Sequence, residues 1–152
     1  MALKQASRLL MLRTPLGDDA LVLTAFSGRE EISRLFCFQL EMISDNNAIK
    51  AADIVGQNVT WGVKLKDKPP RHFNGFVSRF FAGDEDKSGR RLYRAEVVPW
   101  LWFLTRTADC RIFQDKTVVE IIKQIFQDLS FSDFETAQTQ GSHPKRTYCV
   151  QY

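Results

Sequence analysis

Few residues of this 152-residue chain have side chains that could do chemistry, and they are widely spaced. A cysteine nucleophile needs a base within hydrogen-bond reach, so a thiol would have to meet His72 or His143 in space. Nothing in the spacing predicts such a meeting. Cys37, Cys110 and Cys149 also form no CxxC pair, which argues against a disulfide framework or a zinc ribbon and favours folding in a reducing cytoplasm. We therefore expect structural roles for all three cysteines.

Metal binding and acid–base catalysis find equally little support. His143 and Cys149 could share a metal ion, but a closed zinc site needs four ligands and the neighbouring residues offer no more. Carboxylates are adjacent at Glu30 and Glu31 and again at 84–86, each time in a polar turn that favours solvated groups, whereas acid–base catalysis calls for burial. The sequence therefore predicts no catalytic residue, no metal site and no cofactor, and a protein that is not an enzyme.

Nucleotides and nucleic acid are not favoured as ligands either. The glycines stand alone in strand and hairpin contexts, whereas a phosphate-binding loop gathers them in front of a helix. Arg90, Arg91 and Arg94 lie around Tyr93, but side chains alternate between the faces of a strand, so these arginines form no single basic patch. The formal net charge is only +3, from 21 basic and 18 acidic residues, and it implies no polyanionic partner.

Length and composition indicate one domain with a real core. Hydrophobic residues make up 44% of the chain and charged residues 26%, and twelve phenylalanines supply bulk for the faces of strands. The apolar run 9–12 ends at Arg13, well short of the ~7–15 residues of a signal-peptide core, and no stretch approaches the ~18 residues of a membrane span. We expect a protein that is made in the cytoplasm, and any export to proceed without a cleavable signal peptide.

Alternating apolar and polar residues predict a series of short strands. The expected strands cover 8–13, 20–26, 36–42, 59–65, 71–82 and 91–98, and a further strand pattern begins at 146. The first two should form a hairpin across the turn at 15–19, and Gly75 marks a bulge or a bend. Short strands at even spacing favour a small barrel or a sandwich.

The last strand of this series leads into a corner and then a helix. Pro99 ends the strand, and a dense aromatic segment follows at 100–104. From Thr117 the apolar residues recur every three or four positions, and Thr117 with Glu120 has the spacing of a capping box that fixes where the helix begins. The predicted fold class is therefore mainly β, a β-barrel with an appended amphipathic α-helix, and α+β overall.

Three stretches carry a resemblance to a known family: GREEISRLFCFQLEMIS at 28–44, FNGFVSRF at 73–80 and PWLWFLTRTADCRIFQDKTVVEIIKQIF at 99–126. They closely resemble the VgrG spike proteins of type VI secretion, whose first part is similar to a bacteriophage contractile tail hub. The resemblance extends from about Leu9 to Tyr152. It implies a first hub β-barrel of the tail-tube or tail-hub kind in 1–107, and in 108–152 the corner and helical segment that lead into a second barrel, absent here.

The resemblance implies a structural function. In that family three subunits, each with two barrels, make a six-barrel ring that adapts a trimeric spike to the hexameric tube protein and the baseplate, for the delivery of effectors. For this chain it implies a homotrimer in the full-length protein, with the tube protein, baseplate components, and effectors or their adaptors as partners. It implies export through the secretion apparatus, with no nucleic acid and no membrane-spanning segment.

The resemblance gives architectural roles to residues of one strand and of the corner: Phe73, Gly75, Phe76, Pro99, Trp100, Trp102, Leu104, Arg106, Arg111 and Gln114. Arg106 and Arg111 could instead lie at a subunit or baseplate contact, and the sequence does not decide between fold and interface. If the corner pins the helix to the barrel, Trp102→Ala should cost about 3–5 kcal/mol, as for a fully buried tryptophan.

A second function stays open at this point. The chain could be a stand-alone β-barrel that binds single-stranded nucleic acid or a small ligand through exposed aromatic side chains. It would then bind an oligonucleotide tightly and salt-sensitively, and it would need no second barrel. The low net charge counts against this alternative.

Overall fold

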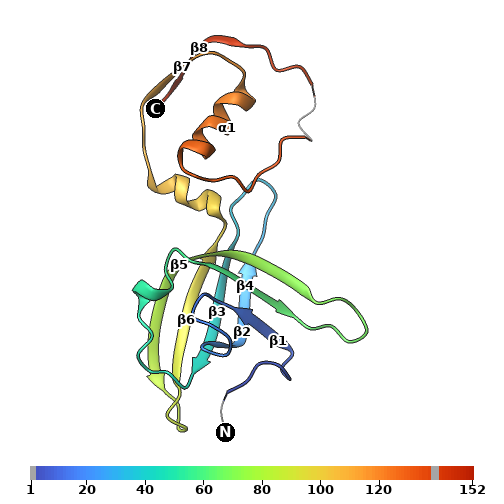
Figure 1. Cartoon of the computed structure of the whole chain (residues 1–152), viewed down its shortest axis with the longest axis vertical. Coiled ribbons are helices and arrows are strands. Elements are labelled where there is room, and N and C mark those ends of the chain that lie inside the picture. Colours follow the sequence, from blue (N-terminus) through green and yellow to red (C-terminus); the bar gives the residue numbers. More distant parts are fainter. Residues whose placement is uncertain (1–2, 138–140) are drawn as a thin grey trace. The chain divides into compact units, whose positions relative to one another are not determined.

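The structure, a computed structural model, describes residues 3–137 and 141–152. It divides into two compact units, Met1–Trp102 and Phe103–Tyr152 (Figure 1). The first unit contains six strands and a turn of 3₁₀-helix, the second combines two strands with an α-helix, and a further 3₁₀-helix spans the division between them. None of the helices in the described ranges is both long and apolar enough to cross a lipid bilayer.

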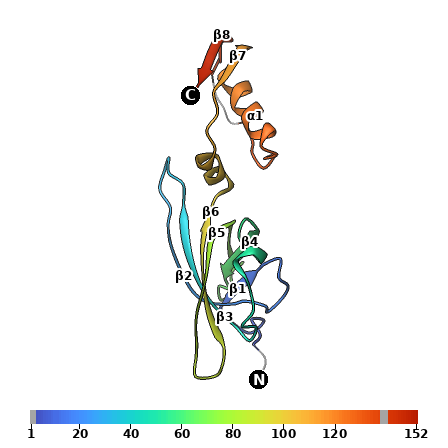
Figure 2. The same ribbon diagram turned by 90° about the vertical axis from the view of Figure 1, so that its left-hand side faces the viewer.

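The first unit is an antiparallel six-stranded sheet with the order β1-β4-β5-β6-β3-β2. Its elements are β1 (Leu10–Arg13), β2 (Val22–Arg29), β3 (Cys37–Ser44), η1 (Ala51–Asp53), β4 (Asn58–Val63), β5 (Arg71–Glu85) and β6 (Arg91–Val98). The sheet curls until its outer strands, β1 and β2, come into contact, so that the barrel is nearly closed (Figures 1 and 2). The predicted mainly β fold with a barrel is confirmed.

The period-two pattern of the sequence decides which side chains fill this barrel. In β3, Phe38, Leu40 and Met42 are buried while Gln39 and Glu41 between them face solvent. Because neighbouring strands repeat the alternation in register, their inward residues meet in one core, to which Leu21 and Ile54 are added from outside the strands. The strand residues of this core are Leu12, Leu23, Phe38, Leu40, Met42, Val59, Trp61, Val77, Phe80, Tyr93, Ala95 and Val97.

Two sequence predictions about this sheet need correction. β1 and β2 form no hairpin: β1 pairs with β4, and β2 pairs with β3 at the other end of the sheet. Turn residues at 15–19 reverse the chain in either arrangement, and only the contacts of the barrel select the partner. Of the bulge or bend predicted at Gly75, the bulge is absent, since Gly75 lies in regular register opposite Val59 and the register shifts later in β5, between Val77 and Arg79, while the bend stays a prediction.

The second unit contains β7 (Arg111–Lys116), α1 (Val118–Asp128) and β8 (Arg146–Gln151), and η2 (Trp100–Arg106) crosses from the first unit into it. β7 and β8 pair antiparallel, with Phe113 opposite Cys149, and α1 contacts β7 (Figure 2). The predicted capping box is confirmed: the Glu120 N–H donates to Thr117 Oγ1 at 3.2 Å and the Thr117 N–H donates to Glu120 Oε2 at 2.7 Å.

Candidate functional site

A cluster of aromatic rings fills the interior of the barrel where β2, β3, β4 and β5 meet. Trp61 stacks on Phe73 with ring centroids 5.6 Å apart and an interplanar angle of 14°. Phe38 meets both rings, at 5.1 Å from Trp61 and 5.3 Å from Phe73, and Phe26 and Phe36 extend the group. Such stacked and tilted pairs stabilise a core beyond the burial of area alone. The cluster therefore fixes the shape of the barrel.

Two glycines make this packing possible by leaving out a side chain. A Cβ on Gly75 would lie 2.7 Å from Val97 Cγ1 and 2.9 Å from the Val98 carbonyl oxygen, and one on Gly28 would lie 2.0 Å from the Phe38 ring. Real Cβ atoms do not approach other atoms so closely. Gly75 is thus held by close approach of its neighbours rather than by a special backbone angle, which explains its place in a regular strand.

A polar clasp joins the loop after β3 to β6 at one end of the barrel. Asp45 accepts hydrogen bonds from the Leu3 N–H at 3.1 Å and from Arg90 Nε at 3.0 Å, and the Tyr93 hydroxyl donates to the Asn46 carbonyl oxygen at 2.8 Å. The bond from the Leu3 N–H, and then the pairing with Arg90, lower the pKa of the Asp45 carboxyl below its ordinary value. No feature of the sequence pattern predicted this clasp, because its members are far apart along the chain.

The corner residues lie in η2, and none of the η2 residues is buried. Trp100, Trp102 and Leu104 are half-buried and Arg106 is exposed, while Pro99, half-buried, separates η2 from β6. The cost predicted for a fully buried Trp102 is therefore too high. The corner lies at the boundary between the two compact units.

Arg111 is tied into the second unit by two carboxylates. Its guanidinium lies 2.5 Å from an Asp109 oxygen and 2.6 Å from an Asp128 oxygen at the end of α1, and these bonds raise the pKa of Arg111, Asp128 contributing most. The contact links β7 to the last turn of the helix. Gln114, on the same strand, is exposed and lies opposite Tyr148. For Arg111 these contacts favour a role in the fold over a role in an interface. Whether Arg106 serves the fold or an interface stays a prediction.

The remaining sequence-predicted residues, Phe73, Gly75 and Phe76, follow one another in β5. Phe73 belongs to the aromatic cluster and Gly75 is buried beneath Val97. Phe76 is half-buried and lies opposite Val98. These three residues belong to the barrel, whereas Arg111 and Gln114 belong to the second unit, so the predicted residues form two groups rather than one site.

Within residues 3–137 and 141–152, three observations bear on a nucleophilic or a metal site. Burial, together with Glu96, raises the pKa of the Cys37 thiol, and a raised pKa disfavours the thiolate that a nucleophile requires. His72 is exposed and lines a recess of about 470 Å³ with Met11, Thr60 and Lys64, and no cysteine of the described ranges lines it. Residues 3–137 and 141–152 contain no group of three or more potential metal ligands.

Comparison with known proteins gives the fold a family. The family model of the phage tail baseplate hub (GPD) matches residues 29–152. The type VI secretion system spike protein VgrG1b of Pseudomonas aeruginosa is 43% identical over 152 residues, which is 100% of this chain and 20% of the relative. VgrG1a of the same bacterium is 43% identical over 150 residues, which is 97% of this chain and 23% of the relative. The chain thus spans about a fifth of the length of these relatives.

A solved structure supports the same assignment at the level of the fold. It is the E. coli c3393 protein, described as a component of the type VI secretion system with structural similarity to the T4 bacteriophage tail proteins gp27 and gp5. It matches with a TM-score of 0.73 and 21% identity, and the match covers 93% of this chain and 39% of that chain. The chain therefore belongs to the phage tail baseplate hub family, with VgrG spike proteins of type VI secretion among its relatives.

Proposed function

We propose that this chain is the hub portion of a type VI secretion spike and that its function is assembly rather than turnover. The observation that carries the proposal is the nearly closed barrel around a tightly packed aromatic cluster, in a chain that matches the baseplate hub family over 29–152. A rigid barrel of this kind suits a part that must keep its shape under load. The clustered rings and the two glycines beneath them serve packing.

The proposed assembly is a homotrimer that adapts a spike to a hexameric tube. Three subunits with two barrels each present six similar barrels in a ring, which matches the symmetry of the tube protein stacked on it. β1 and β2 come into contact in the barrel described above but are not paired with each other, so each keeps one edge without a strand partner. Contacts to the neighbouring barrel, the tube and the baseplate are then made by side chains on outer faces and hairpins, or at these two edges.

The domain assignment stays a prediction within this proposal. Residues 1–107 form the first hub barrel, and 108–152 form the corner and helical segment that lead into a second barrel of the longer protein. The corner residues and Arg106 then shape the connection between the barrels. Effectors or their adaptors are the partners proposed for the remainder of the spike, and the spike leaves the cell through the apparatus that it caps.

The test compares this fragment with a chain extended through the second barrel. Masses in solution are measured by light scattering, and binding of both proteins to purified tube protein is measured by interferometry. We expect a trimer that binds the tube only for the extended chain. If both chains stayed monomeric, and the fragment bound a single-stranded oligonucleotide in a salt-dependent manner, the assembly role would be refuted in favour of a binding module.

A further inference from the structure

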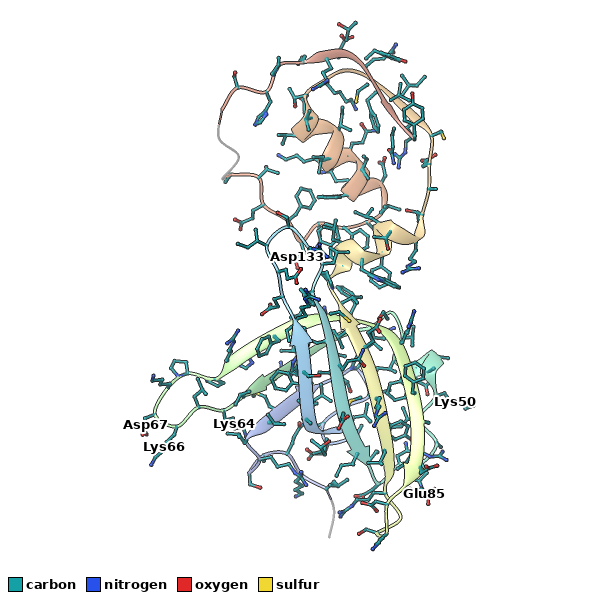
Figure 3. All side chains as sticks on the ribbon, turned by 180° about the vertical axis from the view of Figure 1, so that it is seen from behind. Lys50, Lys64, Lys66, Asp67, Glu85 and Asp133 are labelled. Atoms are coloured by element: carbon teal, nitrogen blue, oxygen red, sulfur yellow. The ribbon has the colours of Figure 1, made fainter. Side chains whose placement is uncertain are left out.

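The excess positive charge of the chain is concentrated on one hairpin. The segment 64–72, which consists of the connection between β4 and β5 and the first two residues of β5, has the sequence KLKDKPPRH and contains four cations and one carboxylate. Its formal charge of 4 − 1 = +3 equals that of the whole chain, so the other acidic and basic residues cancel. Figure 3 shows Lys66 and Asp67 at the end of this hairpin, where it extends beyond the body of the barrel. The hairpin tip is defined here as 65–70, and its cations are Lys66 and Lys68.

Two of the four cations are occupied by contacts within the barrel unit. Lys64 Nζ donates to the carbonyl oxygens of Gln5 and Ala6. The Arg71 guanidinium lies 4.8 Å from the centre of the Phe73 ring, and it is 4.0 Å from a Glu30 oxygen. These contacts anchor the base of the hairpin. Lys66 and Lys68, nearer the end of the hairpin, take no part in these contacts.

Lys66 and Lys68 carry the charge that the fold does not use. Both are exposed, and neither makes an ion pair with any residue in the described part of the chain. Lysines often protect the open edge of a sheet, but Lys66 and Lys68 lie in the loop between β4 and β5, outside the paired residues of either strand, so they do not line such an edge. Leu65 beside them is 45% exposed, which places an apolar side chain among the charges.

We propose that the hairpin tip is a docking contact for an acidic protein surface, with Lys66 and Lys68 as its charged rim and Leu65 as its apolar centre. Protein interfaces combine an apolar centre with a polar rim in this way. Nucleic acid fits less well, because Asp67 stands between the two lysines and 65–70 contains no aromatic residue on which a base could stack. This inference rests on the proposed hub function, in which the acidic surface belongs to the tube protein.

The experiment uses the chain extended through the second barrel and purified tube protein. The variant Lys66→Glu/Lys68→Glu is compared with Lys50→Glu/Lys87→Glu, which makes the same change in net charge at two exposed lysines elsewhere on the barrel unit (Lys50 is labelled in Figure 3). Thermal unfolding establishes that both variants are folded. We expect the hairpin variant to bind the tube about ten-fold more weakly, mainly through a slower association rate, and to lose most of the salt dependence. The control variant should bind as the unmodified protein does.

The outcomes separate this inference from the proposed function. If the unmodified protein binds the tube and both variants bind equally well, the hairpin inference is refuted and the hub function stands. If the unmodified protein does not bind the tube at all, the hub function fails and the inference with it. If a single-stranded oligonucleotide binds and only the hairpin variant loses it, while tube binding is unchanged, the hairpin recognises nucleic acid and the inference is overturned.

Discussion

Gly75 offers the sharpest test of how the barrel is packed. The structure leaves no room for a methyl group at this position, since a Cβ would lie 2.9 Å from the Val98 carbonyl oxygen and 2.7 Å from Val97 Cγ1. The first atom belongs to the backbone of the adjacent strand and the second to a stiff β-branched side chain, so neither can turn aside. In Gly75→Ala, β5 and β6 must therefore move apart over the centre of the core.

The expected decrease in the free energy of unfolding of Gly75→Ala follows from the cost of overpacking a core. Inserting one methyl group into a closely packed core costs about 1–3 kcal/mol, and the backbone contact puts Gly75→Ala in the upper part of that range. Gly83→Ala is the matched control, because Gly83 lies in the same strand and a Cβ there would have its nearest neighbour at 3.4 Å, on Leu92. Ordinary contact and a less flexible unfolded chain should make that change neutral, or stabilising by about 0.4–1 kcal/mol.

Urea unfolding followed by tryptophan fluorescence measures both changes, because the fully buried Trp61 reports on the interior of the barrel. With a slope of about 2 kcal/mol per molar urea, a loss of 2 kcal/mol moves the midpoint of Gly75→Ala down by about 1 M. The slope itself should stay the same. Equal midpoints for Gly75→Ala and Gly83→Ala would refute the close-approach explanation and would return Gly75 to the role of an ordinary strand residue.

Three further changes test other parts of the chain. Thr117→Ala should lower the free energy of unfolding by about 1 kcal/mol by removing the cap of α1, measured by urea unfolding, and Thr117→Ser should restore it. Asp45 has a lowered pKa in the folded state, so its stabilisation is complete above its unfolded pKa of about 4 and is lost as the pH falls through the folded value. Asp45→Asn should thus be less stable than the unmodified chain at pH 7 and equal to it at the lowest pH, and a pH-independent difference would contradict this. Trp61→Ala should lower the free energy of unfolding by about 3–5 kcal/mol, because Trp61 is fully buried, whereas Trp102→Ala at a half-buried position should lower it by clearly less, both measured by urea unfolding. Equal decreases would show that η2 is packed as tightly as the core.

Local pattern alone predicted several elements closely. The alternation of Phe38, Leu40 and Met42 with polar residues marked β3, and the spacing of Thr117 and Glu120 marked the start of α1. Both signals are carried by neighbouring residues, and they depend only on the period of the backbone and on short-range hydrogen bonds. A fold that is mainly β with one helix follows from such signals.

The same local signals could not predict which strands pair with each other. A turn of Pro, Gly and Asp at 15–19 is equally compatible with a hairpin and with a chain that passes to the other end of a sheet, and the second arrangement is the one that occurs. Gly75 illustrates the same point for a single residue. Its sequence context indicated a bulge or a bend and not a close approach, because the atoms that exclude a side chain belong to Val97 and Val98, more than twenty positions away.

The sequence by itself determined that the chain builds short strands and one capped helix. Only the tertiary structure decided which strands meet and why Gly75 must lack a side chain. The physical reason is that periodicity and capping act over a few residues, whereas ring packing and close backbone approach arise between segments that only the barrel brings together.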